Sequence, residues 1–280
     1  MSNKDILSNI KKLREMTGVG FKDCKLAIDE NNGDIEKSIE FLRKKGIAKA
    51  SKKMSRTASE GLALVNHKDG DVSIIEINSE TDFVAKNEDF ISFCKEISNI
   101  TFSQKGDIEK INDTNMKNNI SVKDNLIDLI AKIGEKITLR RAKFFNSDKG
   151  DNFSYVHSAV DKNIGKIISI VKLSKSDNAK EIGNKLAMHI AASSPISLDK
   201  ESLSKEIIDK ELEIIKAELI NSGKKPDMID KISQGKLNKF ISDNTLLNQA
   251  WIMDPKLKVC DVLQDCKVLD FVRYKVGEGV

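Results

Sequence analysis

The chain has 280 residues, of which 39% are hydrophobic and 32% charged, a composition typical of a well-solvated protein with room for two or three modules. No apolar run is long enough to span a bilayer and the N-terminus lacks the layout of a signal peptide, so we expect a cytoplasmic protein without a membrane partner. The formal net charge is +4, but lysines and acidic residues alternate along most of the chain, which argues against a phosphate-binding stripe.

Residues 1–46 predict three short helices. Apolar side chains recur at helical spacing on both sides of a glycine-rich turn at 17–20. Asp34 can cap the third helix, which we expect to end near Gly46. Residues 47–60 are rich in Lys, Ala and Ser, and this composition predicts a basic linker that is mobile or partly helical.

Residues 61–145 predict a first core subdomain of strands and helices. Two apolar runs flank Asp69-Gly70, which is a good signal for a β-hairpin. After a helix and a polar stretch, Ser121 opens an amphipathic helix that Gly134 closes. A further strand is expected at 137–145.

Residues 146–280 predict a second core subdomain with a helical arm. Strands at 153–160 and 164–173, followed by a helix at about 177–192, repeat the order of the first subdomain, so we interpret the two as related. The stretch at about 202–243 predicts two helices that return on each other as an antiparallel coiled-coil arm. The chain as a whole is therefore predicted to be an α+β protein.

Phe83 lies between two polar runs just after a predicted strand, where a rigid scaffold can present a side chain to a partner. It could also share one face of a helix with Phe90, Cys94 and Ile97, and it would then be buried in the core. The residues alone leave both interpretations open.

No motif of an enzyme occurs in the sequence: we find no phosphate-binding loop, dinucleotide fingerprint, zinc-protease motif or nucleophile elbow. The four cysteines form no C-x-x-C pair and are expected to be reduced and buried. His189, on an apolar helix face, is expected to be a hydrogen-bonded core residue. We therefore predict no catalytic residue, no cofactor and no metal site.

Several strings in the sequence form a recognisable series. One reads Thr81-Asp82-Phe83-Val84-Ala85-Lys86-Asn87. A longer one reads Leu13-Arg14-x-x-Thr17-Gly18-x-Gly20-x-x-Asp23-Cys24-Lys25-x-Ala27. Shorter ones are Lys132-Ile133-Gly134-Glu135, Tyr155-x-His157, Met188-His189-Ile190-Ala191-Ala192-Ser193 and Phe271-x-Arg273. Together and in this order they resemble the elongation factor Ts family, the nucleotide-exchange factors of the translational GTPase EF-Tu.

This resemblance implies a non-catalytic guanine-nucleotide exchange factor with a UBA-like N-terminal module. Phe83 would insert beside a helix of the EF-Tu G domain and disturb the phosphate and Mg²⁺ region, with Asp82 placing polar contacts beside it. A 2:2 complex is possible. From the alternating charges and the low aromatic content we expect no direct nucleic-acid contact. The residues that it implies as EF-Tu contacts are Thr81, Asp82, Phe83, Val84, Ile133, Gly134, His157, Ile252, Met253, Arg14, Phe21, Lys22 and Lys25.

Phe21 and Lys22 stand where relatives often have methionine, so the EF-Tu contact that the resemblance implies for them is less typical of the family.

Two alternatives from other classes of protein stay open. A basic RNA- or ribosome-associated protein could use the cationic residues from Lys49 to Arg56. A UBA-type adaptor would bind its partner through the N-terminal module and have no exchange activity.

Overall fold

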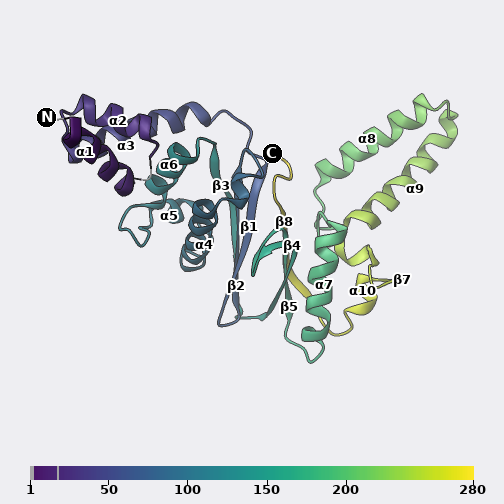
Figure 1. Ribbon diagram of the computed structural model, residues 1–280. Coiled ribbons are helices and arrows are strands. Elements are labelled where there is room, and N and C mark those ends of the chain that lie inside the picture. Colours follow the sequence, from purple (N-terminus) through teal and green to yellow (C-terminus); the bar gives the residue numbers. More distant parts are fainter. Residues whose placement is uncertain (1–2, 18) are drawn as a thin grey trace. The chain divides into compact units, whose positions relative to one another are not determined.

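The structure, a computed structural model, describes residues 3–17 and 19–280. Gly18, which belongs to the longest of the family-like strings, lies outside the described residues. The predicted α+β class is confirmed, because helices accompany an antiparallel sheet (Figure 1).

The chain divides into two compact units. Unit 1 comprises Met1–Phe144, Ser158–Lys166 and Tyr274–Val280. Unit 2 comprises Phe145–His157 and Ile167–Arg273.

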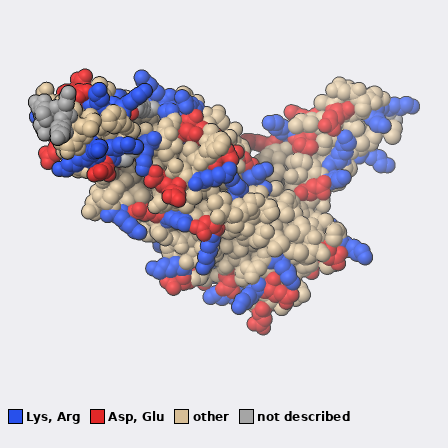
Figure 2. All heavy atoms as spheres, in the orientation of Figure 1, with Lys and Arg blue, Asp and Glu red and all other residues tan. Residues whose placement is uncertain are grey.

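Charges of both signs share the surface. On the face shown in Figure 2, lysines and arginines are interspersed with aspartates and glutamates rather than collected in one stripe. Within the described part of the chain, no helix combines the length and the apolar character needed to cross a bilayer.

Unit 1 begins with three helices whose apolar faces meet. α1 spans Asn3–Thr17, α2 spans Phe21–Glu30 and α3 spans Ile35–Lys53. The side chain of Asp34 accepts a hydrogen bond from the backbone N–H of Lys37 at 3.0 Å, so the predicted N-cap of α3 is confirmed. We call α1, α2 and the first half of α3 the head. Its core consists of Ile10, Leu13, Cys24, Ala27, Ile28 and Leu42.

A β-hairpin follows the head. Its strands β1 (Glu60–Lys68) and β2 (Asp71–Ser79) pair antiparallel along their whole length. Asp69 and Gly70 both have positive φ, 53° and 86°, as a two-residue turn requires when its twist matches that of the strands. The predicted hairpin is therefore confirmed.

Further strands extend the hairpin on both sides. β3 (Ile137–Phe145) lies beside β2. The first residues of β5 (Ile164–Ser174) lie beside β1, where Ala63 faces Gly165. The predicted strand at 137–145 is confirmed to the residue.

Helices cover one face of these strands (Figure 1). α4 spans Glu88–Ser103, the short α5 spans Ile108–Asp113 and α6 spans Val122–Ile133. The hydroxyl of Ser121 caps α6 and Gly134 ends it, as predicted. The short α5 lies in the polar stretch, for which we made no structural prediction. The core between the helices and the strands includes Leu62, Leu64, Ile75, Ile77, Phe90, Ile97 and Ile130.

The expected end of α3 near Gly46 is wrong, because α3 continues to Lys53. A Cβ atom at Gly46 would lie only 3.3 Å from the Cβ of Ala131 in α6, so glycine lets the two helices approach closely. Ala50, one turn later, is buried in the core under the hairpin. This packing offsets the roughly 1 kcal/mol by which glycine disfavours a helix interior.

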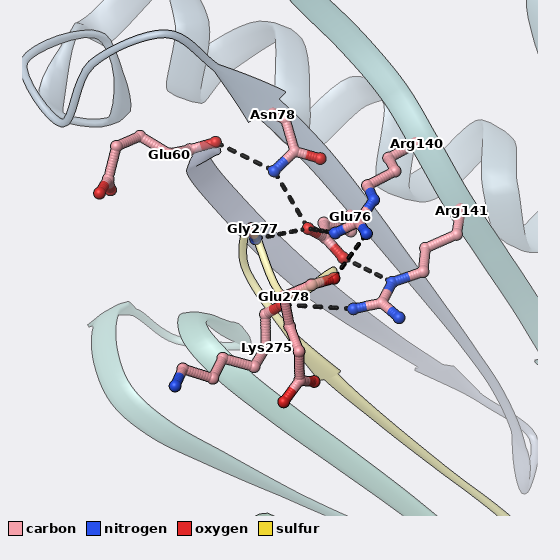
Figure 3. A network of polar contacts seen from close by, with 8 residues as sticks. All are labelled: Glu60, Glu76, Asn78, Arg140, Arg141, Lys275, Gly277 and Glu278. Carbon is pink, nitrogen blue, oxygen red and sulfur yellow. Dashed lines mark hydrogen bonds and ion pairs between the residues drawn. The ribbon is translucent and has the colours of Figure 1, made fainter. Parts of the chain in front are cut away.

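The other face of the hairpin carries a fully buried carboxylate, Glu76, between the core residues Ile75 and Ile77 (Figure 3). It accepts hydrogen bonds from Arg140 Nη1 at 2.9 Å and from Arg141 Nε at 2.6 Å. The network continues to the C-terminal residues of the unit.

The backbone N–H of Gly277 donates to the same carboxylate at 2.9 Å. A Cβ atom at this glycine would lie 1.9 Å from the carbonyl oxygen of Ser59, so no larger residue fits without a backbone shift. The guanidinium of Arg141 also donates to the carbonyl of Lys275 at 3.2 Å (Figure 3). The network thus attaches the last residues of the chain to β2 and β3.

Unit 2 contains two strands followed by a helix. β4 (Gly150–Asp161) pairs with β5, and β8 (Val268–Lys275) pairs with β5 as well. α7 spans Ala179–Ser193, close to the predicted helix. The core of the unit includes Val171, Leu173, Leu186, Ile190, Leu246 and Trp251.

Two long helices of unit 2, α8 (Lys205–Asn221) and α9 (Pro226–Asn244), lie side by side (Figure 1). The hydroxyl of Ser204 caps α8 by accepting a hydrogen bond from the backbone N–H of Ile207 at 3.3 Å. Apolar residues between the helices form a small core of their own: Leu203, Ile215, Leu219, Leu237 and Ile241.

A short ribbon and a one-turn helix complete unit 2. After the short 3₁₀ helix η2 (Leu246–Asn248), β6 (Ala250–Trp251) pairs with β7 (Asp254–Lys258), for which we had no prediction. α10 spans Val259–Val262.

The prediction that all cysteines are buried is wrong for Cys260, which is exposed. In the one-turn helix α10 its neighbour Val259 enters the core, so the next side chain points away from it. Cys24, Cys94 and Cys266 are buried, and all four thiols are free.

Glu76 should make stability depend on pH. Burial opposes its ionisation, but the N–H of Gly277 and the guanidinium of Arg141 outweigh burial and lower the pKa of the carboxyl from its ordinary value of 4.5. A group with a lowered folded-state pKa stabilises the fold above its unfolded pKa, and this contribution is lost as the pH falls through the folded value. The free energy of unfolding of the wild type should therefore fall as the pH drops below about 4.5.

We expect Glu76→Gln to lower the free energy of unfolding at pH 7 by roughly 3 kcal/mol and to flatten this acid dependence. Urea unfolding at several pH values measures both. Glu60→Gln is the matched control, because Glu60 pairs with Lys166 at 2.7 Å on the partly exposed surface, where a pair contributes less than about 1 kcal/mol. Equal losses for the two variants would contradict the role of the buried network.

Candidate partner-binding site

Phe83 lies in the turn that follows β2, and its side chain is 78% exposed. The two residues after it, Val84 and Ala85, are buried in the core below and begin the short 3₁₀ helix η1 (Val84–Lys86). α4 begins only at Glu88, so Phe83 is not on the helix face that starts at Phe90. The interpretation of Phe83 as a core residue is therefore wrong.

The turn with Phe83 is attached to the loop between α6 and β3 by reciprocal hydrogen bonds. Thr81 donates its backbone N–H and its hydroxyl to the carboxylate of Glu135, at 2.9 and 2.7 Å. In return, Glu80 accepts the backbone N–H of Lys136 at 2.6 Å. Hydrogen bonds to ionised carboxylates are stronger than those between neutral groups. We call this set of contacts the Glu80–Glu135 clasp.

The last residue of α3 and the segment after it contact the same region. Arg56 Nη1 lies 3.1 Å from a carboxylate oxygen of Glu80, and the ammonium of Lys136 donates to the carbonyl of Arg56 at 2.8 Å. The ammonium of Lys53 donates to the carbonyl of Gly134. Burial opposes ionisation of Glu80, but the N–H of Lys136 and the guanidinium of Arg56 prevail and lower the pKa of its carboxyl.

A second charge pair flanks the aromatic ring. Lys86 donates to the carboxylate of Asp82 at 2.8 Å, and this hydrogen bond lowers the pKa of Asp82. The ammonium lies 6.0 Å from the centre of the Phe83 ring, the outer limit of a cation–π contact. Both charged side chains are exposed, so the pair contributes little to stability. It surrounds the apolar ring with polar groups that a partner can contact.

The remaining predicted contact residues of unit 1 lie in two places. Ile133 and Gly134 form the end of α6 directly before the clasp, and Ile133 packs partly against the core. Those of the head are exposed on α1 and α2: Arg14, Phe21, Lys22 and Lys25. Val84, by contrast, points into the core.

In unit 2, the predicted contacts Ile252 and Met253 are exposed in the turn between β6 and β7. His157 is exposed in β4, with the hydroxyl of Tyr155 at 3.4 Å from its Nδ1. These residues are separate from those of unit 1 in the sequence and belong to another compact unit.

His189 is a hydrogen-bonded core residue, as predicted. Its Nε2 lies 3.0 Å from the amide oxygen of Gln249, and its ring stacks on Trp251 with centres 5.2 Å apart. The backbone N–H of Ile252 points to its Nδ1 at 3.4 Å. Burial lowers the pKa of the imidazole, which favours the neutral ring.

The sequence did not reveal the residues that hold Phe83 in place. Glu135 is part of a family-like string, but nothing in the sequence indicates that its carboxylate binds Thr81, 54 positions away. Glu80 and Arg56 are also joined over a long distance along the chain. Polar residues next to Phe83 were the only signal that such contacts exist.

Comparison with known proteins places this arrangement in a family. The family model described as elongation factor TS matches residues 80–278, beginning within the turn that carries Phe83. Elongation factor Ts of Paracoccus denitrificans is 42% identical over 97% of this chain and 92% of its own length. Those of Maricaulis maris and Rickettsia felis are 39% and 38% identical, each over 97% of this chain and 91% of their own lengths. The chain therefore belongs to the elongation factor Ts family of translation elongation factors.

Proposed function

We propose that this protein is a guanine-nucleotide exchange factor that promotes GDP release from EF-Tu and acts in the cytoplasm without catalysis of its own. The observation that carries the proposal is the exposure of Phe83. This residue is 78% exposed and lies on a turn that the Glu80–Glu135 clasp holds, in a member of the elongation factor Ts family. Single exposed apolar side chains are common on protein surfaces, so the exposure of Phe83 supports the proposal only together with the hydrogen bonds that hold its turn and with the family membership.

Exchange of this kind needs no contact with the nucleotide. If the protein binds the nucleotide-free GTPase more tightly than the loaded one, it weakens nucleotide binding by the same factor, because coupling between two sites is reciprocal. The absence of an enzyme motif from the sequence fits such a mechanism.

Phe83 is the residue that inserts into the G domain of EF-Tu in this proposal. Burial of such a ring in the partner contributes roughly 1.5 to 3 kcal/mol, which corresponds to about tenfold to hundredfold in an equilibrium constant. The Glu80–Glu135 clasp fixes the turn before binding, so little conformational freedom is lost when the ring inserts. Packed helices respond to such a wedge by discrete shifts, which would disturb the phosphate and Mg²⁺ region.

The other contacts would come from both units. We propose that Thr81 and Asp82 contact the partner beside Phe83, as do Ile133 and Gly134. The head would add Arg14, Phe21, Lys22 and Lys25, and unit 2 would add His157, Ile252 and Met253. The exposure of the head and unit 2 side chains supports these roles.

The domain organisation that we propose follows the family resemblance. The N-terminal residues 1–46, which include the head, form a UBA-like module, and the parts at 61–145 and 146–280 are two related core subdomains. The common order of two strands and a helix supports the relation between the subdomains. α8 and α9 form an antiparallel coiled-coil arm, which the apolar core between them supports.

The RNA-binding alternative depends on the cationic residues after Gly46. Lys53 and Arg56 are both engaged with groups of their own chain, the carbonyl of Gly134 and the carboxylate of Glu80. The side chain of Lys49 lies outside the described residues. Engaged cations are poorer phosphate ligands, so this observation favours the exchange factor.

Phe83→Ala should abolish most of the exchange activity and leave the fold intact. Because the ring is exposed, its removal should change the free energy of unfolding by no more than about 0.5 kcal/mol. The maximal rate of GDP release from EF-Tu should fall roughly tenfold to hundredfold. Urea unfolding and stopped-flow release of a fluorescent GDP analogue measure the two effects.

Phe90→Ala is the matched control, because Phe90 is 0% exposed and lies seven positions further along. It should lower the free energy of unfolding by about 3 to 5 kcal/mol. A similar loss of stability in the Phe83 variant would contradict the proposal that the ring is free to insert.

Acceleration of GDP release by the wild type should saturate with protein concentration and persist when salt is raised. A buried apolar contact is little affected by screening, whereas binding to phosphate groups weakens steeply with salt because counterions are released. Stopped-flow traces at two salt concentrations measure this. Loss of all acceleration at the higher salt, together with RNA binding at the lower, would favour the RNA-binding alternative.

A further inference from the structure

From Arg43 onward, α3 contacts α6 and the core of unit 1 on successive turns. Arg43 Nη2 lies 2.8 Å from a carboxylate oxygen of Asp124 at the start of α6. Gly46 approaches Ala131 of the same helix so closely that an added Cβ would be 3.3 Å from its Cβ. Ala50 is buried in the core under the hairpin.

The contacts continue to the turn that carries Phe83. Lys53, the last residue of α3, donates to the carbonyl of Gly134, which lies at the C-terminal end of α6. Arg56 pairs with Glu80 at 3.1 Å and thereby joins the Glu80–Glu135 clasp. From Arg43 to Arg56, therefore, each turn of the chain has a partner in the core.

The first half of α3 belongs to the head. Leu42 is buried in the core of the head, and Ile35 and Ile39 pack against that core. One uninterrupted helix thus contributes side chains to two apolar cores. A bend between them would break the backbone hydrogen bonds of α3 and expose one of these faces.

We propose that α3 is a rigid strut that holds the head and the turn of Phe83 as one body, and that Lys53 and Arg56 are positioning residues for nucleotide exchange. This inference rests on the proposed function. Of the two forms predicted for the linker at 47–60, mobile or partly helical, the strut corresponds to the partly helical one.

The strut has a consequence for binding. With a flexible linker, docking of the head would only raise the local concentration of Phe83 near its target, and the turn would still lose freedom on insertion. With a rigid strut, the head and the Phe83 ring reach their binding sites on the partner together, and no conformational freedom of the turn is lost on insertion. Substitution of Lys53 and Arg56 should therefore lower the maximal rate of exchange. It should change less the concentration of this protein at which the rate is half-maximal.

A distance measurement tests the strut without any partner. Spin labels on Lys12→Cys in α1 and Ser92→Cys in α4, in a full-length Cys260→Ser background that removes the exposed thiol, report the distance from the head to the core. Double electron–electron resonance should give one narrow distribution. A broad distribution in this protein would overturn the proposal.

The variant Lys53→Ala/Arg56→Ala should broaden the distribution and lower the maximal rate of GDP release from EF-Tu roughly threefold to tenfold, because a pair with a partly exposed cation such as Arg56–Glu80 contributes only modestly. Lys44→Ala is the matched control. It removes a lysine from the exposed face of the same helix, where Lys44 pairs with Glu40 of the preceding turn at 2.7 Å. This control should leave both the distribution and the rate unchanged.

An unchanged distribution in the double variant would overturn the positioning role of Lys53 and Arg56. So would a double variant that exchanges as fast as the wild type. The single variant Arg56→Lys retains Lys53 and keeps a hydrogen-bond donor for Glu80. Its maximal rate of GDP release should therefore lie between those of the double variant and the wild type. If the wild type itself fails to accelerate GDP release, the proposed function is wrong, whereas the distance measurement still decides whether α3 is a strut.

Discussion

The Glu80–Glu135 clasp is the constraint on which the presentation of Phe83 depends. Two carboxylates from neighbouring segments each bind the backbone of the other segment, so neither segment can move alone. Val84 and Ala85 anchor the same turn in the core. An exposed aromatic on a mobile turn would fold back onto the surface, whereas this turn holds it in water. The conformational freedom of the turn is thus lost during folding rather than on contact with a partner.

Two further sets of contacts make the base of this turn rigid. Glu76 joins β2, which precedes the turn with Phe83, to β3, which follows the loop with Glu135 (Figure 3). The same carboxylate also binds the backbone N–H of Gly277 near the C-terminus. The segment that follows α3 reaches the clasp through Arg56, three residues after the end of the helix, which pairs with Glu80. The buried network and the strut therefore serve the same small region of unit 1 from different elements.

Local chemistry made much of this fold predictable from the sequence. The Asp69-Gly70 turn, the Asp34 cap and the Gly134 stop each depend on residues within one turn of the backbone, so short patterns identified them. The end of α3 was missed because Gly46 is kept helical by its contact with another helix, which no local pattern encodes. The clasp was missed for the same reason, and the exposure of Phe83 could not be decided from helical spacing alone.

Amide hydrogen exchange of the free protein tests most directly whether the turn is fixed before it meets a partner. The backbone N–H groups of Thr81 and Lys136 each donate to a carboxylate, and they report the two halves of the clasp. Both amides should exchange slowly, as groups do that open only with a larger part of the structure. Exchange of these two amides at the rate of an unprotected loop would contradict a turn that is fixed in the free protein, because Phe83 would then be held only after binding.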